Sequence, residues 1–162
     1  MPPAAPPLLR VASFNIRVDH DADAGTPHEW HLRRAQASAA VARLDCDLVL
    51  LQEPGPRQAG ELQADLGRSF SVEVLPCDPE AWSGAAEPPT GQRSDGNGFV
   101  WRADRLEMVG GMTNFWFSES PDGPGGGAWD SSEYRRTCSE AKFRDLSTGR
   151  RVHAFSAHFD HV

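Results

Sequence analysis

The sequence predicts an α/β (α+β) fold, because helical and strand patterns alternate early in the chain and strand patterns dominate later. The continuous apolar run over 48–51 is typical of a strand that is buried on both faces. The Ala- and Arg-rich segment over 29–44 carries apolar residues at helical spacing, and residues 70–75 alternate as a strand does. A single domain fits the 162 residues.

The remaining elements follow from the same patterns and from the turn residues between them. Pro54 and Gly55 end the strand over 48–51, and Ser147-Thr148-Gly149 is typical of a hairpin turn. Long loops are expected over 77–95 and 118–133. The expected elements are strands over 8–14, 48–51, 70–75, 98–102, 105–109, 113–117, 136–144 and 151–158, with helices over 29–44 and 59–66. The strand over 105–109 is expected to continue the preceding strand or to pair beside it.

The two ends of the chain carry separate expectations. Residues 1–7, rich in Pro and Ala, are expected to be a disordered lead, and residues 8–162 to form the domain. In the last strand, both faces are largely apolar or small, which predicts a strand covered on both sides. His158 and Asp160 are expected to leave its far end on one face, and His161 on the other.

Composition disfavours several classes of protein, among them membrane-spanning, secreted and disulfide-rich proteins. Acidic residues outnumber basic ones by 23 to 16, and the net charge of −7 does not favour long nucleic acid, although a bound divalent cation can supply local positive charge. No run is long enough for a membrane span, and the N-terminus lacks a secretory pattern. Cys46, Cys77 and Cys138 form no CxxC pair, so neither structural zinc nor a disulfide framework is expected. These features predict a cytoplasmic protein with reduced thiols, and they do not specify an oligomeric state.

Three strings place a polar residue at the carboxyl end of an apolar run. They are Ser13-Phe14-Asn15-Ile16-Arg17, Leu51-Gln52-Glu53 and Ala157-His158-Phe159-Asp160-His161. This end of a strand is where an α/β sheet presents chemistry to solvent. The carboxamide of Asn15, the carboxylate of Glu53 and the imidazole of His158 therefore predict a site for a metal and a phosphate.

Each of these residues also has an ordinary structural explanation when it is taken alone. Asn15 suits a turn, Glu53 suits a solvated strand end, and His158 suits a core in which its nitrogens are satisfied. Their joint placement at three strand ends favours the functional interpretation.

Other candidate patterns fail. The Gly-rich stretch over 123–127 lacks the Gly-Lys-Ser/Thr end of a phosphate-binding loop, and His28 and His31 are wrongly spaced for a zinc protease helix. No Gly-x-Ser-x-Gly nucleophile elbow occurs. The Arg33-Arg34 pair is expected on a solvated helix face, and the aromatic residues of 115–117 in core and loop packing.

Together the strings resemble the endonuclease/exonuclease/phosphatase superfamily, the DNase I-like metal-dependent phosphoesterases. Ser-Phe-Asn-Ile-Arg and Leu-Gln-Glu resemble its first two signatures, and Trp30-His31-Leu32-Arg33 resembles the helix start between them. Residues 97–102 resemble a further strand of the superfamily, and similarity to a bacterial subgroup is carried by residues 115–122, Trp129-Asp130, Arg136-Thr137-Cys138 and 157–161. The resemblance extends from Leu8 to Val162 and implies an α/β sandwich of two packed mixed β-sheets flanked by helices.

The resemblance also implies roles for particular residues. Glu53 would be the main ligand of a divalent metal, Mg²⁺ with Mn²⁺ as the alternative. Asn15 would sit beside that metal and hold a phosphate oxygen or a metal-bound water. Arg136 would contact phosphate, and His158 would contact the scissile phosphate or help to protonate it. The resemblance assigns no role to Asp160 and His161.

Family members continue past the His-bearing strand to a Gly-Asp-Phe-Asn-like motif and a late Asp-His pair, which this sequence lacks. The chain is therefore expected to be the N-terminal portion of such a domain, with its C-terminal part missing. The first functional hypothesis is a Mg²⁺-dependent phosphoesterase acting on a phosphodiester or phosphomonoester. The alternative is a catalytically inactive remnant or interaction module. Membership of a fold family does not specify the substrate.

Overall fold

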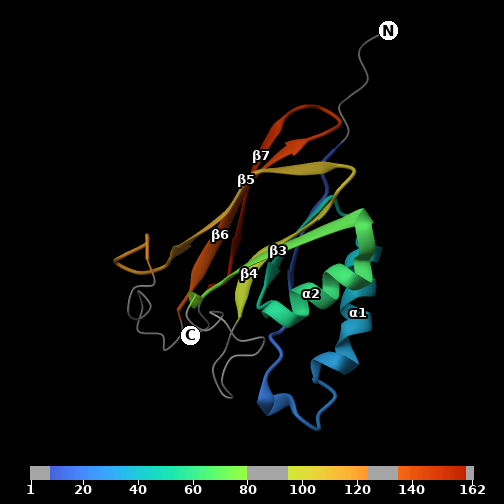
Figure 1. The fold of residues 1–162 in the computed structure, drawn as a ribbon, viewed down its shortest axis with the longest axis vertical. Coiled ribbons are helices and arrows are strands. Elements are labelled where there is room, and N and C mark those ends of the chain that lie inside the picture. The colour runs from blue at the N-terminus through green and yellow to red at the C-terminus, as the bar shows by residue number, and fades with distance from the viewer. Residues whose placement is uncertain (1–7, 80–94, 124–134, 160–162) are drawn as a thin grey trace.

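The chain forms a two-sheet sandwich in a computed structural model that describes residues 8–79, 95–123 and 135–159 (Figure 1). Its elements run in chain order as β1 (Val11–Asn15), η1 (Asp21–Asp23), α1 (Trp30–Arg43), β2 (Leu48–Gln52), α2 (Pro56–Leu66), η2 (Gly67–Ser69), β3 (Phe70–Pro76), β4 (Gly96–Arg102), β5 (Leu106–Trp116), β6 (Thr137–Asp145) and β7 (Arg151–Ala157). The predicted sandwich of packed sheets with flanking helices is confirmed. The predicted Pro/Ala lead lies outside the described residues.

The first sheet has the strand order β1-β2-β4-β3 and is mixed. β1 and β2 run parallel and are connected through α1, whereas β4 is antiparallel to both β2 and β3. Parallel pairing places the carboxyl ends of β1 and β2 at the same edge, with Asn15 opposite Gln52. The residues of β2 are nearly all buried, as its apolar run predicts.

The second sheet, β5-β6-β7, is antiparallel among the described strands. The segments predicted as separate strands over 105–109 and 113–117 form the single strand β5, and it pairs with β6 instead of continuing beside β4. The register shifts around Gly110 and Gly111, whose φ angles of 83° and 79° lie in the left-handed region. The two glycines therefore form a bulge within one strand, where the sequence pattern suggested an end.

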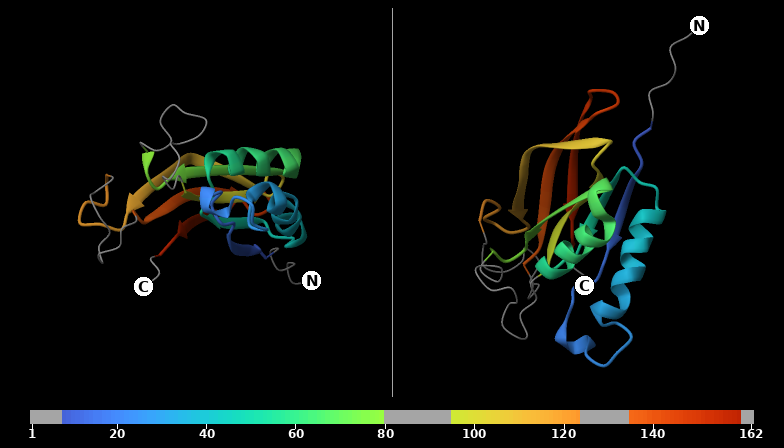
Figure 2. Two further views of the ribbon diagram at one scale, coloured as in Figure 1. Left: turned by 90° about the horizontal axis from the view of Figure 1, so that it is seen from below. Right: turned by 45° about the vertical axis from the view of Figure 1, so that its right-hand side comes forward.

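Both helices pack on the outer face of the first sheet (Figure 2). Trp30 and Val41 of α1 and Leu62 of α2 contribute to one apolar cluster with the outward side chains of β2 and β4. α2 begins at Pro56, earlier than the predicted start at Ala59, because proline suits the first turn of a helix. No helix in the described part of the chain is long and apolar enough to cross a membrane.

A second apolar cluster lies between the two sheets, at the end where β2 begins. Phe143 of β6 packs edge-on against Phe99 at 5.7 Å between ring centroids and against Trp101 at 5.4 Å. Leu48 and Leu106 complete its fully buried side chains. At the other end of the sandwich, where β2 ends, the side chains between the sheets are polar and do not belong to this cluster.

The prediction that the last strand is covered on both faces is wrong. Ala154 and Ser156 of β7 face the first sheet and are buried, whereas Phe155 on the opposite face is 46% exposed. The helices α1 and α2 both pack on the first sheet, so neither of them covers the face of β7 that carries Phe155. Apolar residues occur on exposed protein surfaces as well as in cores, so an apolar face does not by itself indicate a covering layer.

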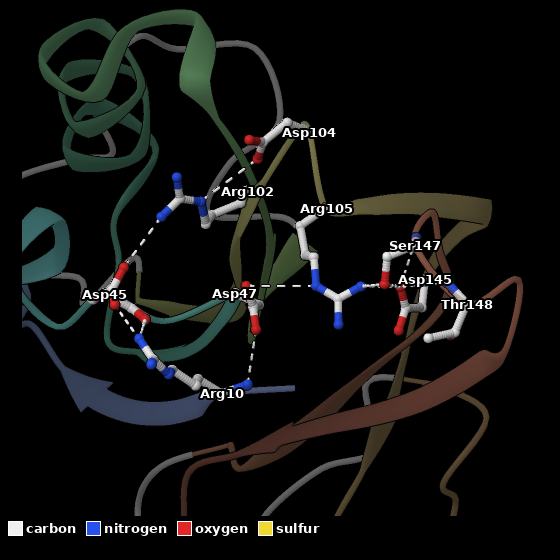
Figure 3. A network of polar contacts seen from close by, with 9 residues as sticks. All are labelled: Arg10, Asp45, Asp47, Arg102, Asp104, Arg105, Asp145, Ser147 and Thr148. Carbon is white, nitrogen blue, oxygen red and sulfur yellow. Dashed lines mark hydrogen bonds and ion pairs between the residues drawn. The ribbon is translucent and has the colours of Figure 1, made fainter. Parts of the chain in front are cut away.

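An ionic clamp, defined as Arg105 with Asp47 and Asp145, joins the two sheets at the amino end of β2 (Figure 3). Arg105 Nε lies 3.8 Å from Asp47 Oδ1, and its Nη1 pairs with Asp145. Asp145 also accepts hydrogen bonds from the backbone N–H groups of Ser147 at 2.9 Å and Thr148 at 3.2 Å. Since Asp47 precedes β2 and Asp145 ends β6, the clamp links sheet to sheet far from Asn15.

Candidate functional site

Asn15 and Glu53 meet where β1 and β2 end. Asn15 Nδ2 donates to Glu53 Oε1 at 2.9 Å, while Asn15 Oδ1 accepts from the backbone N–H of Arg17 at 2.8 Å. Glu53 Oε2 accepts from the backbone N–H of Val18 at 3.1 Å. Hydrogen bonds on both partners therefore orient the two side chains, and they form one oxygen-rich pair at the sheet edge.

His158 reaches this pair from the second sheet. It follows β7, and its Nε2 lies 3.5 Å from Glu53 Oε1 with the side chain 17% exposed. Arg136, immediately before β6, places Nη1 3.1 Å from His158 Nδ1. The structure thus brings together the four residues that the sequence pattern and the resemblance pointed to, Asn15, Glu53, Arg136 and His158, although their chemical roles stay predictions.

The Arg136 contact determines which nitrogen of His158 carries the proton. A guanidinium has only donors, so Nδ1 must accept from Arg136 Nη1. In the tautomer that this contact favours, Nε2 carries the proton, on the side that faces Glu53 Oε1. Arg136 is only 4% exposed, so the contact that sets this tautomer is protected from water.

Asp95 is a further acidic residue at the site, and the sequence analysis missed it by assigning it to the end of a loop. Its Oδ2 lies 4.0 Å from His158 Nδ1, and the residue is buried. The available signal was an acid directly before a buried strand. Because β4 runs antiparallel to β2, it begins where β2 ends, and the Glu53 N–H donates to Gly96 O at 3.0 Å.

The backbone around the site adopts conformations that are uncommon for residues with a side chain. Arg17 and Glu53 have φ angles of 56° and 64°. The left-handed region costs about 1–2 kcal/mol for such residues, so neighbouring contacts must maintain it. Gln58 of α2 supplies three: its Nε2 donates to Arg17 O at 2.8 Å, and its Oε1 accepts from the N–H groups of Asp19 and Gly55, each at 3.0 Å.

Arg33 provides another support for this backbone. The prediction that it lies on a solvated helix face is wrong, because its Nη1 donates to Ile16 O at 2.7 Å and its Nη2 to Arg17 O at 3.2 Å. Burial lowers the pKa of the Arg33 guanidinium, although Asp23 nearby opposes that effect. Arg33 therefore holds the segment that follows Asn15, a role visible only once α1 packs beside β1.

A buried polar layer lies directly beneath the site, between the sheets. Gln52 Nε2 donates to Ser156 Oγ at 3.2 Å, and Asn97 Nδ2 donates to Thr137 Oγ1 at 2.8 Å. All four residues are at most 8% exposed. These bonds join β2 to β7 and β4 to β6, the strands that lead to the site residues.

Cys77 belongs to the same layer, and its surroundings argue against a role as a catalytic thiol. Its Sγ lies 3.1 Å from Thr137 Oγ1. Burial, with a further contribution from the Asp95 carboxylate, raises the pKa of the thiol to about 12. Because the thiolate is the reactive form, Cys77 is not a nucleophile at neutral pH.

The donor set fits a hard divalent cation. Glu53 offers a carboxylate and Asn15 a carboxamide oxygen, and proteins hold Mg²⁺ through one or two carboxylates together with substrate phosphates. Within the described ranges, no three His, Cys, Asp or Glu side chains gather closely enough to hold an ion among themselves. Asp160 and His161 lie outside the described residues.

Several solved structures share this fold. Among solved structures, an endonuclease/exonuclease/phosphatase from Bacteroides vulgatus is 28% identical with a TM-score of 0.76, over 95% of this chain and 53% of that one. A family protein from Bacteroides thetaiotaomicron is 25% identical with a TM-score of 0.80, over 98% and 53%. A mannosyl-6-phosphatase of the same organism is 25% identical with a TM-score of 0.78, over 96% and 53%.

The chain thus spans about half the length of these structures. No curated protein sequence matches it significantly. The model of the endonuclease/exonuclease/phosphatase family matches residues 12–151, which run from β1 to the start of β7. With the fold, the strand-end motifs and this match in agreement, the chain belongs to the endonuclease/exonuclease/phosphatase family.

Proposed function

We propose that residues 8–162 form the N-terminal portion of a Mg²⁺-dependent phosphoesterase domain, with Mn²⁺ as the alternative ion. The convergence of three strand ends on Glu53 carries the proposal. Glu53 Oε1 lies 2.9 Å from Asn15 Nδ2 and 3.5 Å from His158 Nε2. The reaction is the attack of water on a phosphate ester.

Glu53 and Asn15 would hold the ion. A bound Mg²⁺ draws charge from the phosphate oxygens and polarises water. Glu53 contributes an anionic oxygen, and the Val18 N–H bond restrains its carboxylate. Asn15 would contribute its neutral Oδ1, which also accepts from the Arg17 N–H, and so would add a ligand oxygen without adding a second charge.

His158 would act on the phosphate through its Nε2–H, the proton on the Glu53 side. This donor suits a non-bridging phosphate oxygen or the departing ester oxygen. Arg136 keeps the imidazole in the required tautomer and places positive charge behind it. Its burial favours action through His158 over the direct phosphate contact that the resemblance implies.

The substrate class is a phosphate ester of modest charge. The net charge of −7 disfavours a long polyanion, because charges of the same sign repel. Similarity to a mannosyl-6-phosphatase supports including a hexose 6-phosphate among the compounds tested.

The first test substitutes Glu53→Gln, which removes the charge and keeps the size. We expect the loss of Mg²⁺ binding, measured by calorimetry on residues 1–162, and of Mg²⁺-stimulated hydrolysis of nitrophenyl phosphate esters. The matched control is Glu73→Gln, an exposed carboxylate in the middle of β3. Wild-type binding and turnover of Glu53→Gln at limiting Mg²⁺ would contradict the metal role.

The second test substitutes His158→Ala. Positioned acid–base groups contribute about 10²–10⁴-fold to a rate, so the loss of turnover should exceed any loss of folded protein. If the wild-type chain binds Mg²⁺ but hydrolyses no phosphate ester in the panel, the non-catalytic alternative gains support.

A further inference from the structure

We infer that Gln52 is a positioning residue that sets the separation of Glu53 and His158 through its hydrogen bond to Ser156. Its significance for catalysis rests on the proposed function, whereas the contacts themselves exist without any reaction. Gln52 is the middle residue of Leu51-Gln52-Glu53, and the sequence pattern assigns it no role.

The inter-sheet bridge, defined as Ser13, Gln52 and Ser156, is a chain of hydrogen bonds next to the site. Ser13 Oγ donates to Gln52 Oε1 at 3.2 Å, and Gln52 Nε2 donates to Ser156 Oγ at 3.2 Å. Ser156 Oγ in turn donates to Leu51 O at 2.8 Å. Each bridge residue lies one or two residues before a site residue: Ser13 before Asn15 at the end of β1, Gln52 before Glu53, and Ser156 before His158.

Burial makes the central bond of the bridge specific. Gln52 is 8% exposed and Ser156 is 0% exposed, so water cannot readily replace either partner. Apolar contact between sheets is non-directional and tolerates small sliding movements. A hydrogen bond accepts only a narrow range of distance and angle, and an unsatisfied buried amide is unfavourable. The bridge therefore selects one register of β7 relative to β2.

That register decides where the two functional side chains lie. Glu53 follows Gln52 directly, and His158 lies two residues after Ser156, just past the end of β7. A shift of β7 along β2 would carry His158 Nε2 away from Glu53 Oε1, now at 3.5 Å. Functional groups need to be held within about 0.5 Å of their working geometry, so a small shift matters.

The ionic clamp of Figure 3 offers a matched comparison within the same chain. Arg105 also joins the first sheet to the second, but at the amino end of β2 and the carboxyl end of β6. Its side chain is 13% exposed, so it is largely buried, as Gln52 and Ser156 are. Removing it should loosen the sandwich without changing the contacts behind Glu53 and His158.

The experiment is a double-mutant cycle read in the NMR spectrum of residues 1–162, without metal or substrate. The ring nitrogen shifts of His158 are measured at a pH of about 8.5, above the usual range for imidazole protonation. Glu53→Gln removes a charge near the ring, so in the wild-type background it moves these shifts. In the Gln52→Met and Ser156→Ala backgrounds we expect that response to fall, by about 1.3-fold for a shift of about 0.5 Å and about twofold for a shift of about 1.5 Å, because the field of a charge weakens with the square of the distance.

Arg105→Met is the control for a general loss of packing. It should lower the midpoint of urea unfolding while the response of His158 to Glu53→Gln keeps its wild-type size. A response of wild-type size in Gln52→Met and Ser156→Ala would overturn the inference, as would an equal loss in Arg105→Met. Should Gln52→Met fail to fold, Ser156→Ala decides alone, since it removes only one hydroxyl.

This readout is independent of the proposed function. A chain that hydrolyses nothing, or binds no Mg²⁺, still shows whether the bridge sets the distance between His158 and Glu53. The two ideas therefore fail through different measurements.

Discussion

Replacement of Gln58 by leucine should destabilise the protein more than most single substitutions. Gln58 is fully buried at the start of α2, and its amide bonds to the backbone of Arg17, Asp19 and Gly55. Leucine has a similar size but no polar atoms. Gln58→Leu therefore leaves the N–H groups of Asp19 and Gly55 without their side-chain partner, while the Arg17 carbonyl keeps its bond from Arg33.

The magnitude follows from these contacts. A buried backbone group that loses its partner costs about 1–3 kcal/mol, so two such losses predict a decrease of about 2 kcal/mol or more in the free energy of unfolding. Gln63, on the same helix, is the matched control. It also bonds to three backbone groups, those of Gly67, Phe70 and Val72, but it is half-buried. Water can replace its bonds, so Gln63→Leu should cost about 1 kcal/mol.

Urea unfolding followed by circular dichroism measures both variants. With a slope of about 1–3 kcal/mol per molar urea, Gln58→Leu should lower the midpoint by about 1–2 M. Gln58→Glu keeps the two acceptor contacts and should fall between wild type and Gln58→Leu only if the carboxyl is protonated, which mildly acidic buffer favours. A midpoint for Gln58→Leu equal to that of Gln63→Leu would refute the reasoning, because burial would then not control the cost.

Two further predictions concern backbone space and acid stability. A Cβ on Gly98 would lie 2.8 Å from Val74 Cα and contact the backbone of the neighbouring strand, so Gly98→Ala should lower stability by about 2–4 kcal/mol in urea unfolding. Gly60→Ala, with open space around it on α2, should instead raise stability by about 0.5–1 kcal/mol, and equal effects would contradict the packing argument. Although burial opposes it, hydrogen bonds from the 147–148 turn and the charge of Arg105 hold the pKa of Asp145 below its usual value. Its stabilising effect is therefore complete above the unfolded pKa and decreases as pH falls below about 4, and an Asp145→Asn variant should show a flatter loss of stability there.

Much of the fold could be predicted from local patterns. The segments that became α1, β2 and β3 were placed within a few residues, because an apolar period of either kind marks the face that must be buried. The pattern failed at β5, where two glycines formed a bulge instead of a turn. It failed again at β7, because whether a face is covered depends on whether another element packs against it, and the residues of the strand do not determine this.

For the site, too, some residues could be predicted from the sequence and others could not. The resemblance and the strand-end positions pointed to Asn15, Glu53, Arg136 and His158, and the fold brings all four to one end of the sandwich. Asp95 could not be predicted from the sequence, because only the antiparallel pairing of β4 with β2 brings its carboxylate to the edge where β2 ends.

The sequence by itself determined the polar residues at the strand ends and the apolar runs that deliver them, because both are properties of short segments. Tertiary structure alone decided the tautomer of His158, the conversion of Arg33 from a surface residue to a backbone support, and the bridge from Gln52 to Ser156. Each of these joins atoms from segments far apart in the chain. The distances and burial that give such contacts their energy exist only after the two sheets have packed.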